Sequence, residues 1–197
     1  MRGKSFAAII LCVITLFVFA SCTKSGGGIL ARNPDLSKPF QSAVKIQAGE
    51  LELKGTVKRY GMGIWEMTVE SPETLAGLSL AGNDSGVTAS LGDLKLEIPM
   101  ENINDRAVFA LVFKAIDSAA SAADANVLTC TDTQDGKVCK GEFSFGTYTM
   151  TFDPQSLALT KIEIPEAEIY CEFTGFTVIS GGTETVTETT VTQTTVS

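Results

Sequence analysis

The strongest constraint on the fold is one stretch of helical periodicity in a chain whose other apolar residues alternate. Between Asn104 and Ala120, apolar residues recur at spacings of three and four, and two phenylalanines widen their arc. The recurring residues are Val108, Leu111, Val112, Ala115, Ile116 and Ala119, widened by Phe109 and Phe113. Asn104-Asp105 supplies short polar side chains that can cap a helix start. A helix that is apolar over most of its circumference has to be buried on several sides, which a flat sheet cannot do.

The segments on either side of this helix alternate apolar and polar residues with a period of two. That pattern is typical of antiparallel strands that pack one face on a core. Strands are predicted at residues 40–48, 51–58, 65–70, 78–81, 87–91 and 94–98 before the helix, and at 127–131, 137–145, 148–152, 158–164 and 167–178 after it. The predicted fold class is therefore α+β, with a curled antiparallel sheet, an incomplete β-barrel, wrapped around one long apolar helix.

The first 22 residues predict export. Arg2 and Lys4 precede an uncharged apolar run at residues 6–20, which as a helix would be roughly 22 Å long. That length falls short of the ~30 Å hydrocarbon core and suits a cleavable signal better than a membrane span. The run ends in Phe19-Ala20-Ser21-Cys22, which resembles the lipobox of bacterial lipoproteins, although leucine is usual where Phe19 stands. An ordinary secretory signal with an incidental cysteine is the alternative interpretation.

The lipobox resemblance implies that Cys22 receives a diacylglyceryl group and becomes the first residue of the mature chain. Two acyl chains hold a protein stably at a membrane, whereas one does so only marginally. We expect a signal peptide at 1–21, a lipidated N-terminus and flexible tether at 22–39, one domain at 40–179 and a Thr-rich disordered tail at 180–197. The expected location is extracytoplasmic, with membrane contact through the lipid.

Composition removes several classes of function. Without Arg2 and Lys4, 13 basic residues face 23 acidic ones, a net charge of −10 that disfavours nucleic acid as a partner. The chain has no histidine, which excludes a Ser-His-Asp triad, a Cys-His pair and histidine-containing zinc sites. No cofactor or metal is predicted.

An enzyme would have to depend on carboxylates, since a glycosidase needs only two of them. The candidates are Glu163, Glu166 and Glu168, but each alternates with apolar neighbours and is expected on the solvated face of a strand. The sequence has no nucleophile elbow, P-loop or dinucleotide-binding glycine pattern. We therefore expect a protein that is not an enzyme.

Three cysteines remain in the predicted domain, and an exported chain can form disulfides. Cys130 and Cys139 flank the turn signal Gln134-Asp135-Gly136. A four-residue loop at 133–136 would place the two cysteines directly opposite each other, which predicts a disulfide, whereas a two-residue turn at 135–136 would set them diagonally. The alternative is reduced cysteines buried in the core. Cys171 lies in an apolar strand and is predicted to be buried, and a thiolate metal site is disfavoured.

The order of strands, one buried helix and further strands after a lipobox is similar to the LolA/LolB-like fold. Residues 67–78, and residues 152–154 together with 161–165, resemble small lipoproteins of Firmicutes, a structural group that includes the germination lipoprotein of clostridia, which partners a cell-wall amidase. The resemblance covers about residues 40–179. It implies an incomplete barrel that can enclose a lipid-sized cavity, and it carries over no functional residue except Cys22.

The leading functional hypothesis is a non-enzymatic protein that binds a lipid or another apolar ligand between sheet and helix. Its candidate cavity residues are Trp65, Met67, Phe109, Phe113 and Phe145. The same side chains would fill a dry core if no cavity exists. The alternative function is a protein-interaction module that positions or activates a cell-envelope partner such as a cell-wall enzyme.

Overall fold

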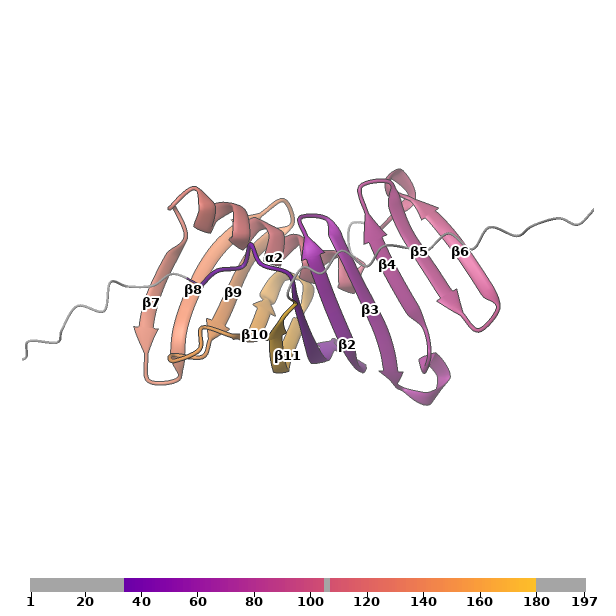
Figure 1. Cartoon of the computed structure of the whole chain (residues 1–197), viewed down its shortest axis with the longest axis horizontal. Helices are drawn as coiled ribbons and strands as arrows, with labels where there is room; N and C mark the ends of the chain where they lie inside the picture. Colours follow the sequence, from indigo (N-terminus) through magenta and orange to yellow (C-terminus); the bar gives the residue numbers. More distant parts are fainter. Residues whose placement is uncertain (1–33, 105–106, 180–197) are drawn as a thin grey trace, which may run out of the picture. The chain divides into compact units, whose positions relative to one another are not determined.

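The computed structural model describes residues 34–104 and 107–179, which form one antiparallel sheet of eleven strands and a single α-helix (Figure 1). The strands before the helix are β1 (Phe40–Ala48), β2 (Leu51–Gly61), β3 (Ile64–Ser71), β4 (Ser79–Asn83), β5 (Gly86–Leu91) and β6 (Leu94–Pro99). The helix, α2, covers Val108–Asp124. After it come β7 (Thr129–Thr133), β8 (Gly136–Phe143), β9 (Gly146–Phe152), β10 (Leu159–Ile164) and β11 (Ile169–Val178). Short 3-10 turns lie at η1 (Glu73–Leu75), η2 (Met100–Asn102) and η3 (Pro165–Ala167).

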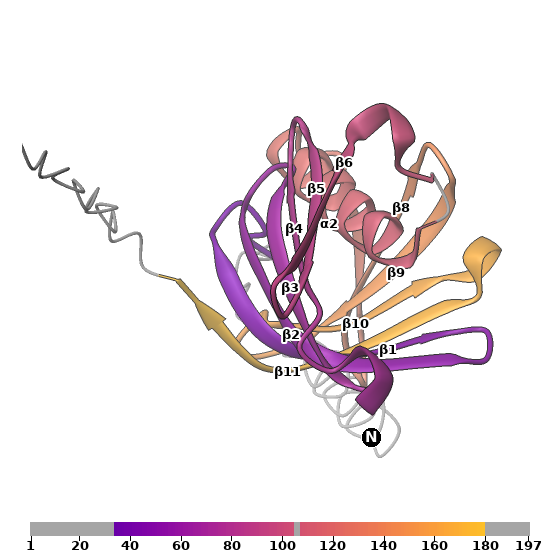
Figure 2. The same cartoon turned by 90° about the vertical axis from the view of Figure 1, so that its right-hand side faces the viewer.

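The strand order is β6-β5-β4-β3-β2-β1-β11-β10-β9-β8-β7, and every neighbouring pair is antiparallel. The two halves of the sheet meet where β1 pairs with β11, and β6 and β7 form its two open edges. Figure 2 shows the sheet curved, with α2 on its inner side. The predicted antiparallel, unclosed sheet with one α-helix is therefore confirmed.

Alternation along the strands decides which side chains reach the core. In β1, every second residue from Phe40 to Ile46 is buried, Ser42 included, while Gln41, Ala43 and Lys45 are exposed or partly exposed. Trp65 and Met67 repeat the pattern in β3. Because side chains of a strand alternate between its two faces, these residues all lie on the inner face of the sheet. The core therefore forms between this face and α2.

The helix begins later than its sequence pattern predicted. Its N-cap is Ala107, without a side-chain capping hydrogen bond, so the predicted cap at Asn104 is wrong. The Ala107 N–H instead donates to the Asn104 carbonyl at 2.8 Å, so a turn of chain precedes the first helical residue. The helix then runs four residues past Ala120, to Asp124.

The buried face of α2 is broad but not uniformly apolar. Lys114, Asp117 and Ser118 lie partly buried beside its apolar side chains. The fully buried helix residues are Ala110, Leu111, Val112, Phe113, Ala115, Ile116, Ala119 and Ala120. Polar groups on a largely covered helix need hydrogen-bond partners, and Asp117 has them in Arg59 and Gly63.

Several sequence predictions fall outside the described residues. They are the signal peptide, the lipidation site Cys22, most of the tether and the Thr-rich tail. Within the part of the chain that the structure describes, no helix combines the length and apolar character needed to cross a bilayer.

Candidate functional site

The inner face of the sheet carries an aromatic stack built around Trp65. The indole of Trp65, on β3, lies parallel to the Phe113 ring of α2, with ring centroids 4.3 Å apart and an interplanar angle of 9°. Phe109, one helical turn earlier, lies 5.5 Å from the same indole in a tilted arrangement. Trp65 pairs across the sheet with Gly82 on β4, and a Cβ at that glycine would overlap the indole. Because Gly82 has no side chain, the indole can lie directly against the sheet at this position.

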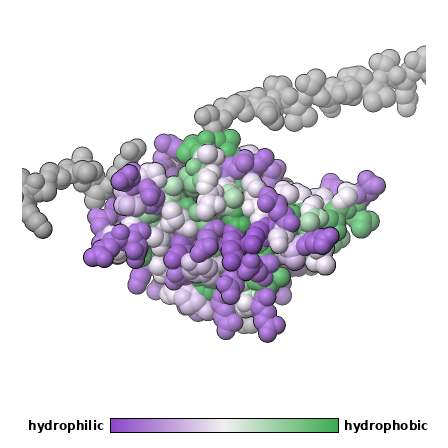
Figure 3. Space-filling view, turned by 90° about the horizontal axis from the view of Figure 1, so that it is seen from below, coloured by the Kyte–Doolittle hydropathy of each residue, from purple (hydrophilic) through white to green (hydrophobic). Residues whose placement is uncertain are grey.

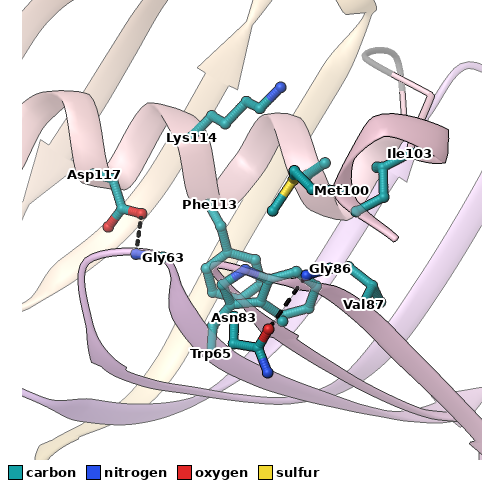
Figure 4. Close-up of a pocket in the computed structure, with 12 residues that line it drawn as sticks. Gly63, Trp65, Asn83, Gly86, Val87, Met100, Ile103, Phe113, Lys114 and Asp117 are labelled. Atoms are coloured by element: carbon teal, nitrogen blue, oxygen red, sulfur yellow. Dashed lines mark hydrogen bonds between the residues drawn. The ribbon is translucent and has the colours of Figure 1, made fainter. Parts of the chain in front are cut away.

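A cavity of about 200 Å³ opens beside this stack (Figure 4). Trp65 and Phe113 form part of its wall, and Asp117, Lys114 and Asn83 supply polar groups. The Asp117 carboxylate accepts a hydrogen bond from the Gly63 N–H at 2.9 Å, while Asn83 Oδ1 accepts one from the Gly86 N–H at 3.2 Å. The full lining is Gly63, Trp65, Gly82, Asn83, Gly86, Val87, Met100, Ile103, Ala110, Phe113, Lys114 and Asp117. This cavity is therefore amphipathic.

A second cavity, of about 240 Å³, has only apolar residues in its lining. It lies between the strands β1 to β4, the turn η1 and the first turn of α2. Its lining is Ile46, Leu51, Leu53, Met67, Val69, Leu75, Leu78, Leu80, Val108 and Phe109. Such a lining offers no side-chain hydrogen-bond partner to a polar ligand, so it suits only an apolar group.

The two cavities are neighbours along β3 and α2. Trp65 lines the first cavity, and Met67, the next inward residue of β3, lines the second. On α2, Phe113 lines the first cavity and Phe109, one helical turn earlier, lines the second. The contact between the Trp65 and Phe109 rings therefore joins the wall of one cavity to the wall of the other.

Four of the five predicted cavity residues thus line these two cavities. The fifth, Phe145, lines neither of the two. Phe145 lies two residues after the end of β8, in the turn that leads to β9, and its ring centroid lies 6.4 Å from that of Phe143. The predicted strand at 137–145 ends two residues early, which moves Phe145 from the inner face of a strand to a turn.

An ion pair around a buried arginine, not predicted from the sequence, holds α2 against the sheet beside the first cavity. Arg59 of β2 is only 1% exposed, and its Nε donates to Asp117 Oδ1 at 2.8 Å while a terminal nitrogen lies 2.7 Å from the same oxygen. The other terminal nitrogen donates to the Leu36 carbonyl at 2.7 Å. The alternation of β2 does indicate that Arg59 points inward, because Gly55 and Val57, four and two residues before it, are buried.

Cys130 and Cys139 are joined by a disulfide in the β7–β8 hairpin. They lie directly opposite each other because Thr133 pairs with Gly136 at the end of the hairpin. The Thr133 hydroxyl donates to the Gly136 carbonyl at 2.8 Å across this turn. Cys171 is a free, buried thiol in β11, and burial raises its pKa to about 12.

Glu163 is partly exposed in β10, whereas Glu166 and Glu168 are exposed but lie outside the strands, in η3 and directly before β11, so their predicted strand positions are wrong. Glu166 accepts hydrogen bonds from the Thr147 N–H at 3.1 Å and from the Thr147 hydroxyl at 2.9 Å, so it joins η3 to the start of β9. A backbone hydrogen bond within Glu166 and those from Thr147 lower the pKa of its carboxyl group. Among residues 34–104 and 107–179, no three histidine, cysteine or acidic side chains gather as a metal site.

No protein-family model and no curated protein sequence matches this chain. Several solved structures are similar to it. An uncharacterized conserved protein from Thermus thermophilus has a TM-score of 0.47 and 13% identity, covering 75% of this chain and 83% of its own. A LolA superfamily protein from Nitrosomonas europaea has a TM-score of 0.40 and 8% identity, covering 77% and 90%. A chain in the structure of the CwlD amidase from Clostridioides difficile in complex with the GerS lipoprotein has a TM-score of 0.42 and 10% identity, covering 85% and 88%.

A LolA superfamily protein, the kind of protein that the sequence resembles, is thus among the similar structures. Because the scores and identities are low, no residue role is transferred from these proteins to this chain.

Proposed function

We propose that this chain is an extracytoplasmic lipoprotein, held at a membrane through Cys22, whose domain binds the apolar chain of a lipid between α2 and the inner face of β1 to β5. The observation that carries the proposal is the cavity of about 240 Å³ whose ten lining residues are all apolar. The cavity opens to the surface, since Leu51 in its lining is 41% exposed. Apolar surface left in contact with water is unfavourable, so an acyl chain that covered this lining would be stabilised by the hydrophobic effect.

The size of the site points to a slender ligand. Pockets for drug-sized molecules typically measure roughly 300–1,000 Å³, and each of the two cavities is smaller than that range. An acyl chain can fill a narrow apolar space segment by segment. The Trp65–Phe109 contact lies where the cavities adjoin, so a small ring movement there would extend the space available to one chain.

The polar groups of the first cavity give such a ligand an orientation. Asp117 and Lys114 project from α2 at the wall of this cavity, whereas the second cavity has only apolar lining. A molecule with one polar end would place that end at the first cavity and its acyl chain toward the second. The proposed ligand class is therefore a single-chain amphiphile, and the proposed role is binding without catalysis.

The proposed anchor is compatible with this site. The twelve residues from Cys22 to Asn33 can span at most roughly 40 Å when fully extended. That reach would keep the domain close to the bilayer surface, where lipids are available.

Native mass spectrometry of residues 33–197, purified from a bacterial host, tests the proposal. We expect a co-purified lipid, or uptake of added palmitate, in one-to-one stoichiometry. Leu78→Gln, which places an amide in the apolar cavity, should lose the bound molecule, whereas Val127→Gln, at a surface position outside both cavities, should retain it. A domain that carries no lipid and takes up no palmitate would contradict lipid binding and favour a module that positions a cell-envelope partner.

A further inference from the structure

The strand β6 is an open edge of the sheet, and it exposes apolar side chains. Leu94 is 75% exposed and Leu96 is 60% exposed. Figure 1 shows β6 as the outermost strand at one end, and Figure 3, which keeps the left–right order of Figure 1, shows hydrophobic residues at that end of the domain. Natural proteins commonly protect an edge with inward-pointing charges or cover it, because an open apolar edge invites pairing with another strand.

The two faces of β6 differ in character. Leu96 pairs with Ala89, which pairs with Leu80 of the core, so Leu96 lies on the inner face of the sheet. Lys95 and Glu97 lie on the opposite face, where Lys95 Nζ is 2.9 Å from Glu97 Oε1. The edge strand is thus apolar on one face and carries one positive and one negative charge on the other.

We propose that two copies of this chain pair through β6, antiparallel and centred on Leu96, to form a dimer with one continuous sheet. In this register Leu96 faces Leu96 of the second copy, and Leu94 faces Ile98 of the second copy. Both apolar faces then lie on the same side, as the period of two requires. The contact is isologous, with each residue pair repeated by the twofold axis.

Charge selects this register over its neighbours. Centring on Leu96 places Lys95 opposite Glu97 of the second copy, and the twofold axis repeats that pair. Moving the centre to Lys95 would place two lysines directly opposite each other, and moving it to Glu97 would do the same for two glutamates. Opposite charges stabilise a cross-strand pair, whereas like charges destabilise it.

Backbone geometry favours the same pairing. The β5–β6 hairpin closes with Leu91 opposite Leu94 across a two-residue turn. In such a hairpin the closing pair exchanges hydrogen bonds and the next pair does not, so the backbone groups of alternate residues point to the open edge. Those residues in β6 are Lys95 and Glu97, the two that the proposed register places opposite each other. Pro99, which has no N–H, ends the strand and limits the interface to its apolar part.

Disulfide trapping in the full chain tests this dimer. Leu96→Cys should give an intermolecular disulfide on mild oxidation, because the two positions face each other across the axis. Leu94→Cys is the matched control, since residue 94 is more exposed yet would lie about 13 Å from its counterpart, beyond disulfide reach. Both substitutions replace exposed side chains and remove little packing. No cross-link at residue 96, or equal cross-linking at residues 94 and 96, would overturn the proposal.

Charge reversal tests the register independently. In the Leu96→Cys background, Lys95→Glu places like charges across the interface and should reduce cross-linking at least fivefold. Adding Glu97→Lys exchanges the two charges, restores complementarity and should restore cross-linking. The register would be contradicted if the Lys95→Glu variant cross-linked as efficiently as Leu96→Cys alone. It would also be contradicted if adding Glu97→Lys did not restore the cross-linking yield. The emission of Trp65 monitors folding in every variant. The dimer does not depend on lipid binding, since palmitate uptake and cross-linking are measured separately.

Discussion

The buried guanidinium of Arg59 and the partly buried carboxylate of Asp117 form an ion pair that joins β2 to α2. The shortest nitrogen–oxygen distance is 2.7 Å, and Asp117 also accepts the Gly63 N–H of the β2–β3 turn. Arg59 further donates to the Leu36 carbonyl, so one charged group holds three segments of the chain together. A buried charge is tolerated only while its partner is present.

Removing the carboxylate should therefore be costly. We expect Asp117→Asn to lower the free energy of unfolding by about 3–5 kcal/mol, because Arg59 would stay buried without a counter-charge. Urea denaturation followed through Trp65 emission gives this value. Glu52→Gln is the control, since Glu52 pairs with Lys45 at the surface, where an ion pair contributes little, and it should lose much less. Equal losses of unfolding free energy in the two variants would show that the Arg59–Asp117 pair stabilises the fold no more than a surface pair does.

The sheet could be predicted from the sequence because alternation records which face of each strand is buried. The predicted strands at 40–48 and 87–91 match β1 and β5 to within one residue at each end. The start of the helix could not be predicted in the same way, because Asn104 has a good capping side chain but its carbonyl is used in a turn. Capping preference is a local signal, and the tertiary fold decides which residue begins the helix.

The candidate site could be predicted only in part. Trp65, Met67, Phe109 and Phe113 were identified because they lie on inner faces, but an inward position does not show whether the space beside it is filled. That depends on how the helix sits over the sheet. The apolar pattern at 137–145 predicts one strand with Phe145 on its inner face, but the chain turns after Phe143, which the pattern does not indicate.

Gly82 should be sensitive to the smallest possible substitution. A Cβ there would overlap the indole of Trp65, which is held from its other side by Phe113. We expect Gly82→Ala to lower the free energy of unfolding by about 1–3 kcal/mol through overpacking and to shift the Trp65 emission maximum. Gly61→Ala is a suitable control, because a Cβ at Gly61 would meet no atom within 4 Å. An unchanged emission spectrum in Gly82→Ala would mean that the indole does not lie against that glycine.

Cys171 predicts a specific dependence of stability on pH. Burial raises the pKa of its thiol from 9.0 to about 12, so the folded chain keeps the proton while the unfolded chain loses it above pH 9. Because the unfolded state then binds fewer protons, the contribution of Cys171 to stability is fully present below pH 9 and is lost as the pH rises toward 12. The wild-type chain should therefore lose stability relative to Cys171→Ala by up to about 1.4 kcal/mol per pH unit in this range.

Paired urea titrations of the wild-type chain and Cys171→Ala at pH 7, 8.5 and 10 measure this difference. Between pH 7 and 8.5 the gap between the two chains should be constant. A gap that stays constant up to pH 10 would show that the thiol ionises alike in both states.

The proposed anchor can be removed without touching the core. Cys22→Ala should move the protein from the membrane fraction to a fraction released by salt washing, because the lipid is the proposed attachment. The free energy of unfolding should stay within about 0.5 kcal/mol of the wild-type value. Fractionation with and without a high-salt wash checks this, and a variant that stays in the membrane after the wash would contradict the anchor.

The most direct test of lipid binding uses Trp65, which is the chain's single tryptophan and lies in the wall of the first cavity. Titration with stearic acid that carries a nitroxide on its acyl chain should quench the Trp65 emission saturably, with one molecule bound per chain. Leu78→Gln should weaken the affinity roughly tenfold, because a buried amide without a partner costs about 1–3 kcal/mol. Quenching that rises linearly without saturation, or that is equal in wild type and Leu78→Gln, would contradict an acyl chain bound between the helix and the sheet.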